Sequence, residues 1–375
     1  MTKDRSTRGS DADYLSAAAQ RFNPVGRIDE IVQFGAGNVN DTFLVSSSTN
    51  REKHFILQRI NRHVFCRPEL IMQNLRVFSE HVSKRLTRNP VHGRRWEIPR
   101  VLLTNDSNDH WIDPGGSFWR AISFIEDAES FDSVAGLGHA TEIGVAVGLF
   151  HTLVSDLPVE KLTDTLEGFH ITPLYVRRYQ EVLEKICAPV SPHTTYCMDF
   201  IDRRERFASV LEDARANGKL PLRIIHGDPK VSNVMIDTRT GLAVSLVDLD
   251  TVKPGLLHYD IGDCLRSCCN PLGEDPGTPD KVRFEPELCR AVLRGYFSVA
   301  KGFLTENDFE FIYDSIRLIA YELGVRFFSD YLDGDVYFKV KDREQNLRRA
   351  LVQFRLVESI ESQAGDLRAI IREAK

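Results

Sequence analysis

The order of hydrophobic and polar positions separates the first third of the chain from the rest. Up to about residue 125, short apolar runs bounded by turn residues predict five β-strands and one helix. The helix is expected to begin at Pro68, because proline is favourable at the first helical position. Its apolar face is expected to hold Leu70, Ile71, Leu75, Phe78 and Val82. The expected strands lie at residues 27–34, 42–46, 54–60, 98–103 and 118–125.

Beyond residue 126 the hydrophobic positions recur mainly at helical spacing. Helices are expected at residues 141–154, 175–186, 316–331 and, as one long helix, about 342–374. The chain is therefore predicted to be α+β and bilobal, with a small lobe built on a five-stranded antiparallel sheet at residues 13–125. A larger, mainly helical lobe follows at residues 126–375, and the polar residues 1–12 are expected to be disordered.

Composition limits the classes of partner. The chain has 375 residues, 42% hydrophobic and 27% charged, with a net charge of -6, so it lacks the broad basic character of a nucleic-acid-binding protein. Its seven cysteines are odd in number and have no repeated spacing, which argues against a disulfide framework. We find no signal peptide and no apolar run near the roughly 20 residues of a membrane span. A cytoplasmic location, without nucleic-acid or membrane partners, is expected; the oligomeric state is left open.

A glycine-containing loop, GAGNVN, connects the first two predicted strands. It contains Gly35, Gly37, Asn38 and Asn40. A dinucleotide-binding loop would open a helix instead, so that interpretation fails. Glycine loops between antiparallel strands cover nucleotide phosphates in kinase-like folds, where backbone N–H groups must come close. A bulged hairpin explains the same residues equally well.

The stretch IIHGDPKVSNVMID carries the most specific chemistry. His226, Asp228 and Asn233 reproduce the H-x-D-x-x-x-x-N spacing of a kinase catalytic loop. Asp228 would accept the proton of an attacking hydroxyl group, and Lys230 would neutralise charge on the phosphoryl group. Asn233 and Asp248, the latter in LVDLD, would bind Mg²⁺ through oxygen atoms.

Each of these residues also has a structural interpretation. Asp228 could cap a turn, Asn233 could bond to its own loop, and Asp248 could end a strand. Together, in this order and after a glycine loop, they predict a phosphotransferase that uses ATP and Mg²⁺. We expect His226 to pack and hydrogen-bond within the loop, and Asp260 to support the loop from outside.

HGDxKxxN followed by LVDLD resembles the aminoglycoside phosphotransferase and choline kinase superfamily of small-molecule kinases. Further segments, FGAGNVNDTFLV, FILQRIN, GFHITP and ELGVRFFSDYLDGDVYF, are similar to the N-acetylhexosamine 1-kinases within it. The similarity runs from about residue 16 to the final helix. It implies a protein-kinase-like fold and transfer of the γ-phosphate of ATP to O1 of N-acetylglucosamine or N-acetylgalactosamine.

The same resemblance implies roles for individual residues. It places the sugar at Asp228, Thr251, Arg326 and Tyr337, and the adenine at the segment from Phe124 to Glu126. Arg326 lies among apolar neighbours in the expected helix, where a lone arginine needs a partner. That partner could be the sugar hydroxyls, Asp248, or Glu322 one turn earlier.

One position departs from the wider kinase pattern. The strand after the glycine loop normally carries a lysine that binds the α- and β-phosphates, whereas FILQRIN has Gln58 there and Arg59 on the other face. The helix offers Asn74 where a glutamate is usual. We expect Gln58 to contact the nucleotide. Two alternatives stay open: a kinase of the same fold for an aminoglycoside, choline, homoserine or fructosamine, or a nucleotide-binding module without catalysis.

Overall fold

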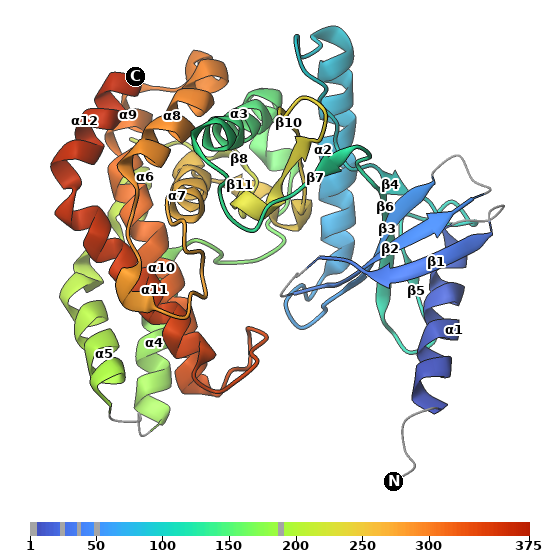
Figure 1. Ribbon diagram of the computed structural model, residues 1–375, viewed down its shortest axis with the longest axis horizontal. Helices are drawn as coiled ribbons and strands as arrows, with labels where there is room; N and C mark the ends of the chain where they lie inside the picture. The colour runs from blue at the N-terminus through green and yellow to red at the C-terminus, as the bar shows by residue number, and fades with distance from the viewer. Residues whose placement is uncertain (1–5, 23–26, 36–38, 49–52, 187–190) are drawn as a thin grey trace. The chain divides into compact units, whose positions relative to one another are not determined.

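The computed structural model describes residues 6–22, 27–35, 39–48, 53–186 and 191–375 (Figure 1). Spatial contacts divide the chain into two compact units. Unit 1 comprises residues 1–79 and 98–126, and unit 2 comprises residues 80–97 and 127–375. The last part of helix α2 and the segment after it, residues 80–97, thus belong to unit 2. A single division of the chain at residue 125 would assign them to the first unit. The domain boundaries expected from the sequence stay a prediction.

Unit 1 is built on a mainly antiparallel sheet with the strand order β1-β2-β3-β6-β4. The strands are β1 (Ile28–Gln33), β2 (Asp41–Ser47), β3 (His54–Ile60), β4 (Val101–Leu102), β5 (Trp111–Ile112) and β6 (Phe118–Ser123). Five of them correspond to the expected strands, although β4 is much shorter than expected. The two-residue strand β5 pairs with β6 and was not predicted.

Helix α1 (Ser6–Arg21) packs on one face of this sheet. Ala18, Ala19 and Phe22 are buried against Leu57 and Trp119, so the apolar end of the segment anchors it. Residues 6–12 form the first turns of α1, and residues 1–5 lie outside the described residues. The expected disorder of residues 1–12 stays a prediction.

Helix α2 (Pro68–Arg88) begins at the expected residue. Ile71, Leu75, Phe78 and Val82 are buried as the spacing predicted, and Leu70 is partly buried.

Unit 2 is mainly helical and carries two small antiparallel sheets, one with the order β10-β9-β7 and one pairing β11 with β8. Its strands are β7 (Ala128–Glu129), β8 (Arg223–Ile225), β9 (Val234–Asp237), β10 (Ala243–Leu246) and β11 (Lys253–Gly255). The helices after α2 are α3 (Leu137–Val154), α4 (Thr172–Lys185), α5 (Pro192–Arg204), α6 (Val210–Ala216), α7 (Leu257–Cys268), α8 (Pro286–Ala300), α9 (Glu306–Glu310), α10 (Ile312–Asp333), α11 (Gln345–Ser362) and α12 (Ala364–Ala374).

Helices α3 and α8 approach each other unusually closely. A Cβ atom added to Gly144 would lie 2.0 Å from the carbonyl oxygen of Val292, and one added to Gly295 would lie 2.0 Å from that of Thr141. Only glycine allows these backbones to pack so tightly. Helix α3 is consequently a core helix of unit 2.

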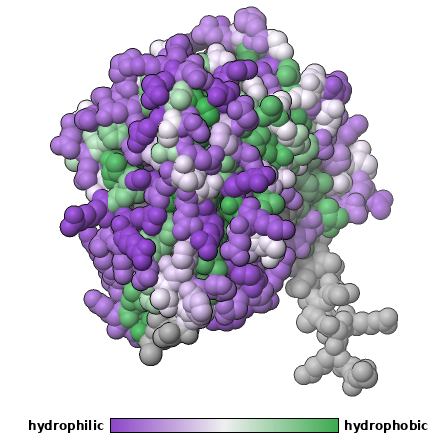
Figure 2. Space-filling view, turned by 60° about the vertical axis from the view of Figure 1, so that its left-hand side comes forward, coloured by the Kyte–Doolittle hydropathy of each residue, from purple (hydrophilic) through white to green (hydrophobic). Residues whose placement is uncertain are grey.

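Among the described residues, α3 is also the one helix long and apolar enough to cross a membrane. We did not predict this from the sequence, because we looked for an apolar run of roughly 20 residues. It is 67% buried inside the structure, as the core helix of a globular protein is. The face of the molecule shown in Figure 2 carries hydrophobic side chains in small groups among hydrophilic ones.

The single helix expected at 342–374 is two helices, α11 and α12, separated at Gln363. The Gln363 side chain donates a hydrogen bond to the Phe284 carbonyl oxygen at 3.0 Å, which fixes the break against the rest of unit 2. The predicted apolar stripe is nevertheless buried throughout: Leu347, Leu351, Phe354, Ile360, Leu367 and Ile371. Periodicity identified the buried face, and a tertiary contact placed the break.

Candidate active site

The loop at residues 226–233 connects two strands that belong to different sheets. The preceding strand β8 pairs with β11, and the following strand β9 pairs with β10. The two strands do not form a hairpin with each other, so no tight turn is required between them. The loop can therefore carry several polar side chains in a defined arrangement.

Asp260 supports the start of this loop. Its carboxylate, on α7, is fully buried and accepts hydrogen bonds from the backbone N–H groups of His226 (2.7 Å) and Gly227 (2.8 Å). The His151 imidazole lies 2.8 Å from the same carboxylate. Burial alone would raise the pKa of Asp260, but these hydrogen bonds and the nearby histidines lower it below its ordinary value. The expected supporting role of Asp260 is confirmed.

His226 is also a structural part of the loop. Its Nδ1 accepts a hydrogen bond from the backbone N–H of Asp228 at 3.2 Å, and its Nε2 donates to the Val247 carbonyl oxygen at 2.9 Å. The ring is buried, and burial lowers its pKa. A neutral imidazole that uses both nitrogens internally is consistent with the expected packing role.

Gly227 allows the loop to turn next to Thr251. Its φ angle of +89° lies in the left-handed region, and an added Cβ would lie 2.9 Å from the Thr251 Cβ atom. Thr251 donates a hydrogen bond to the His226 carbonyl oxygen at 2.8 Å. Thr251 thus holds the same turn; its predicted contact with the sugar stays a prediction.

The side chains of Lys230 and Asn233 both bind the carboxylate of Asp228. The Lys230 Nζ atom donates to Asp228 Oδ2 at 2.6 Å, and the Asn233 amide donates to the same oxygen at 3.0 Å and to the Asp228 carbonyl oxygen at 2.7 Å. The bond of Asn233 within its own loop, which we considered as a structural alternative, is therefore present. It also orients the side chain, because the amide nitrogen faces Asp228 and the amide oxygen is directed elsewhere.

The charges of this group are mutually stabilised. Burial alone would raise the pKa of Asp228, but Lys230 above all, with His226 and Arg266, lowers it. Burial would likewise lower the pKa of Lys230, but the carboxylates of Asp228, Asp248 and Glu274 raise it above its ordinary value. Asp228 is thus ionised and Lys230 protonated at neutral pH.

Asp248 follows β10 and has an exposed side chain and left-handed backbone, with φ 63° and ψ 58°. The carboxylate of Asp248 and the amide oxygen of Asn233 are the hard oxygen donors that Mg²⁺ takes. No group of three or more His, Cys, Asp or Glu side chains among the described residues is arranged to hold a metal ion alone. Mg²⁺ is usually held by one or two protein oxygen ligands together with substrate phosphates and water. The chemistry of Asn233 and Asp248 suits this ion, and their binding of Mg²⁺ stays a prediction.

Arg326 lies on α10 among aromatic rings. Its guanidinium carbon is 5.0 Å from the ring centre of Phe169, 5.1 Å from Tyr175 and 5.9 Å from Tyr337. Its ionic contact is with Glu322, at 4.0 Å, one of the partners considered for it. Burial alone would lower the pKa of Arg326, but Tyr175 and Tyr337, with Glu322 and Asp228, raise it. An arginine side chain keeps its positive charge at any ordinary pH.

The loop after α10 presents Tyr337, which is 40% exposed. Asp330 holds this loop, because Oδ1 accepts from the backbone N–H groups of Val336 (3.0 Å) and Tyr337 (2.8 Å). Its Oδ2 accepts from the N–H of Phe338 at 2.9 Å. We did not single out Asp330 from the sequence. The signal available was an acidic residue in an otherwise apolar part of the helix, shortly before a glycine.

In unit 1, β1 and β2 are antiparallel, so the glycine loop connects strand to strand as expected. Gly35 has φ +73°, a conformation suited to glycine. Asn40 accepts a hydrogen bond from the backbone N–H of Asn61 at 2.9 Å and so fixes the end of β3. Gly37 and Asn38 lie outside the described residues.

Gln58 is engaged within the sheet of unit 1. Its carbonyl oxygen accepts two hydrogen bonds from Arg120 on β6, at 3.0 Å and 2.7 Å, and its amide donates to Thr42 at 3.1 Å. Arg120 is only 2% exposed and is the direct cross-strand neighbour of Gln58. Sequence reasoning missed Arg120, although an arginine inside the apolar run FWRAIS was a visible signal.

Phe124 and Glu126 follow β6 in unit 1. The Phe124 ring lies 5.8 Å from those of Phe34 and His54, and His54 Nδ1 is 2.8 Å from the Glu126 carboxylate. An aromatic group and a polar group at the end of one strand suit the predicted adenine contact, which stays a prediction.

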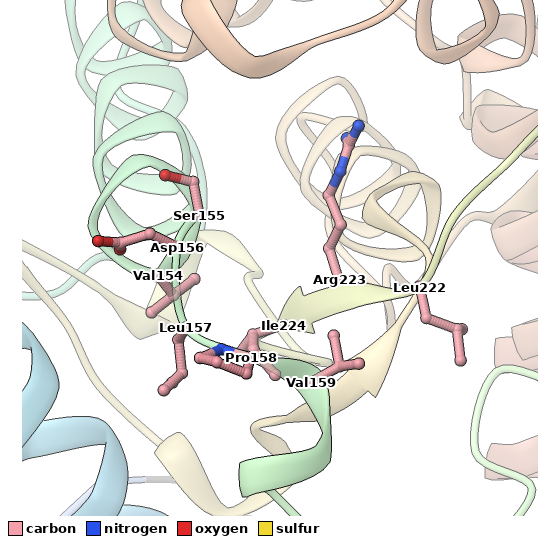
Figure 3. Close-up of a pocket in the computed structure, with 9 residues that line it drawn as sticks. All are labelled: Val154, Ser155, Asp156, Leu157, Pro158, Val159, Leu222, Arg223 and Ile224. Carbon is pink, nitrogen blue, oxygen red and sulfur yellow. The ribbon is translucent and has the colours of Figure 1, made fainter.

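A hollow of about 230 Å³ lies at the other end of β8 from the loop at residues 226–233 (Figure 3). Its walls come from Val154 at the end of α3, from the segment 155–159 that follows it, and from residues 222–224. Arg223 is committed to Asp308 at 3.1 Å. None of the predicted site residues lines this hollow.

Comparison with known proteins agrees with this arrangement. The family model described as the phosphotransferase enzyme family (APH) matches residues 30–321. Because the match covers most of the chain, the protein belongs to this family.

Solved structures with the same fold differ widely in sequence. An aminoglycoside phosphotransferase from Alicyclobacillus acidocaldarius has a TM-score of 0.63 and 13% identity, covering 95% of this chain and 96% of that one. The microcompartment-associated aminopropanol kinase has a TM-score of 0.59 and 14% identity, and the match covers 96% of this chain and 100% of that one. A spectinomycin phosphotransferase, solved with ADP and spectinomycin, has a TM-score of 0.54 and 11% identity, and the match covers 90% of this chain and 93% of that one. The predicted bilobal protein-kinase-like fold is confirmed.

Proposed function

We propose that this protein transfers the γ-phosphoryl group of ATP to the anomeric hydroxyl group, O1, of an N-acetylhexosamine. The observation that carries the proposal is the Asp228 carboxylate, ionised and held by Lys230 and Asn233 at the start of the loop. Membership of a phosphotransferase family supports the reaction class. The acceptor follows from the resemblance of the block around Arg326 and Tyr337 to N-acetylhexosamine 1-kinases.

In the proposed mechanism Asp228 orients the O1 hydroxyl group and accepts its proton during attack on the γ-phosphorus. Lys230 neutralises charge that develops on the transferring phosphoryl group. Asn233 and Asp248 would hold Mg²⁺, which supplies further charge neutralisation on the phosphates. The hydrogen bond between Lys230 and Asp228 keeps both groups in place before the substrates arrive, which lowers the cost of orientation.

The charge around Arg326 supports a neutral acceptor over a cationic one. The neighbouring structures belong to proteins named for amine-containing acceptors, such as an aminoglycoside and aminopropanol. A permanently charged guanidinium at the acceptor would repel such cations, whereas sugar hydroxyl and acetamide oxygens can accept its hydrogen bonds. Choline and aminoglycosides are therefore the weaker candidates.

A nucleotide-binding module without catalysis is the second candidate, because the usual strand lysine is replaced by Gln58. The Gln58 side chain bonds to Arg120 and Thr42, which gives it a structural role within the sheet. The complete set of Asp228, Lys230 and Asn233 favours catalysis.

The test is turnover with Mg·ATP and a panel of acceptors: N-acetylglucosamine, N-acetylgalactosamine, plain hexoses, homoserine, fructosamine, choline and an aminoglycoside. ADP release measures the rate, and ³¹P NMR locates the phosphate. We expect sugar 1-phosphate from the N-acetylated sugars. Turnover only with another acceptor would retain the kinase and reject the sugar, and no turnover with tight ATP binding would favour the binding module.

Asp228→Ala is expected to lower kcat at least ~10²-fold, as the loss of a general base does. The matched control is Asp366→Asn, at an exposed position on α12, which should leave kcat unchanged. A full rate in the Asp228 variant would show that this carboxylate is not the base.

A further inference from the structure

His170 occupies an unusual position two residues before helix α4 begins at Thr172. Its side chain is buried, and its φ angle of +68° lies in the left-handed region, which residues other than glycine seldom adopt. The ring stacks on Tyr259 of α7, with ring centres 5.3 Å apart and an interplanar angle of 24°. A strained and buried polar residue persists only where its surroundings hold it.

Both ring nitrogens of His170 contact hydrogen-bond acceptors. Nε2 lies 2.7 Å from the carbonyl oxygen of Gly227, and Nδ1 lies 3.0 Å from Oε1 of Glu322 on α10. A carbonyl oxygen can only accept, so Nε2 must carry a proton. The Glu322 carboxylate also receives a hydrogen bond from the Thr172 hydroxyl at 2.8 Å. An ionised carboxylate has no proton to give, so Nδ1 carries one too, and the ring is an imidazolium.

The electrostatic surroundings agree with this protonation state. Burial alone would lower the pKa of His170, but the Glu322 charge outweighs burial and raises it. Burial would raise the pKa of Glu322, but His170 above all lowers it. The other charged or titratable groups around this pair are Arg326 of α10, Tyr259 and Asp263 of α7, Tyr175 of α4, Lys253 of β11, and Asp228.

His226 provides a direct contrast on the other side of Gly227. Its Nδ1 accepts the N–H of Asp228, so that nitrogen cannot carry a proton, and its Nε2 donates to a carbonyl oxygen. Two buried histidines that flank the same glycine therefore differ in charge because their partners differ in kind.

We propose that His170 is a positioning residue, whose imidazolium joins the backbone directly before Asp228 to Glu322, one helical turn before Arg326. It fixes the base of the reaction relative to the acceptor end of α10. The inference rests on the proposed function only in assigning Asp228 and Arg326 to the reaction; the charge and the connection belong to the protein itself.

The first test is ¹⁵N NMR of the imidazole rings in the full chain without substrates, from pH 6 to pH 9. We expect His170 to be doubly protonated throughout and His226 to remain neutral with its proton on Nε2. In Glu322→Gln, which keeps the size and removes the charge, His170 should lose its second proton within this range. A wild-type His170 that titrates like an exposed histidine, or a Glu322→Gln variant that changes nothing, overturns the proposal.

The connection to the loop is tested in the same samples. Glu322→Gln should shift the backbone amide signal of Asp228, whereas Glu361→Gln should not, because Glu361 pairs with Arg204 away from this loop. An unchanged Asp228 signal in Glu322→Gln contradicts the link. These readouts need no acceptor, so they stand even if the proposed sugar is wrong.

Kinetics then separate positioning from folding. His170→Asn suits the left-handed backbone and loses one of the two bonds and the charge. We expect the KM for the acceptor to rise at least ~10-fold, the usual effect of losing a bond to a charged group, with the KM for ATP within about twofold. The control is His258→Asn, another buried histidine, bonded to the Asp308 carbonyl oxygen at 2.9 Å. Equal losses of stability with no change in the acceptor KM for either variant would reduce His170 to a packing role.

Discussion

Gln58 and Arg120 form a polar contact between neighbouring strands of unit 1, in which Arg120 is buried and Gln58 is partly buried. The Arg120 guanidinium donates to the Gln58 carbonyl oxygen through two nitrogens, and the two residues are directly opposite in the β3–β6 register. A fixed buried cation, the Arg120 guanidinium, thus lies 2.7 to 3.0 Å from the Gln58 carbonyl oxygen. A second cation at position 58 would lie directly beside the Arg120 guanidinium and be repelled by it.

We therefore expect Gln58→Lys to lower the free energy of unfolding by about 2–4 kcal/mol, because a buried like-charge contact is costly. Gln58→Glu, of nearly the same size and opposite charge, should be tolerated because it pairs with Arg120. Urea unfolding followed by circular dichroism measures both. Equal stability of the two variants would contradict the electrostatic explanation.

Helix α10 and the loop after it form one element that presents the predicted acceptor residues. Arg326 projects from the helix, and Tyr337 from the loop whose backbone Asp330 binds. Asp330 also accepts from the Asn346 side chain of α11 at 2.9 Å, so the loop is tied to the next helix as well. The position of Tyr337 depends on a residue that is itself 5% exposed.

Asp330→Asn should release this loop, because an amide nitrogen would face backbone N–H groups in place of an oxygen. We expect faster hydrogen exchange at Val336, Tyr337 and Phe338, a local loss of about 1–3 kcal/mol, and a higher KM for the acceptor. Hydrogen-exchange mass spectrometry and steady-state kinetics check this. The control is Asp333→Asn on the same helix α10, whose carboxylate forms an exposed ion pair with Arg178 of α4. This variant should change neither the hydrogen exchange of the loop nor the KM for the acceptor.

At the scale of the whole chain, unit 2 depends on carboxylates that are ionised in the folded state, of which Asp260 and Glu322 are buried and Asp228 is partly buried. Asp260, Asp228 and Glu322 all have pKa values below the ordinary ones. A depressed folded-state pKa contributes stability above the unfolded-state pKa of about 4, and this stability is lost as the pH falls through the folded-state value. The unfolded chain binds more protons in this range, so acid favours unfolding.

The free energy of unfolding should therefore fall steeply below about pH 4. Asp260→Asn should be less stable at pH 7 and show a shallower pH slope, by up to ~1.4 kcal/mol per pH unit for one proton. Denaturant titrations between pH 3 and pH 7 measure this. Asp199→Asn, at a position with 59% of its side chain exposed, is the control, and an equal change of slope there would refute the assignment to Asp260.

Spacing along the chain was sufficient to predict features that depend on neighbouring residues. The helix starting at Pro68, the apolar stripe of the last helices and the order of Asp228, Lys230 and Asn233 are all local, because periodicity and loop chemistry act over a few residues. Asn233 reaches Asp228 across five positions. The kinase class of the fold was visible for the same reason.

Contacts between distant residues were decided only by the tertiary structure. Gln58 and Arg120 are 62 positions apart, His170 and Gly227 are 57 apart, and His170 and Glu322 are 152 apart. A single sequence shows that a buried arginine or histidine needs a partner, but folding chooses the partner and with it the charge. Packing brings these groups together in a poorly solvated interior. It therefore decides the protonation of His170, the contact of Gln58 with Arg120 and the loop that Asp330 holds.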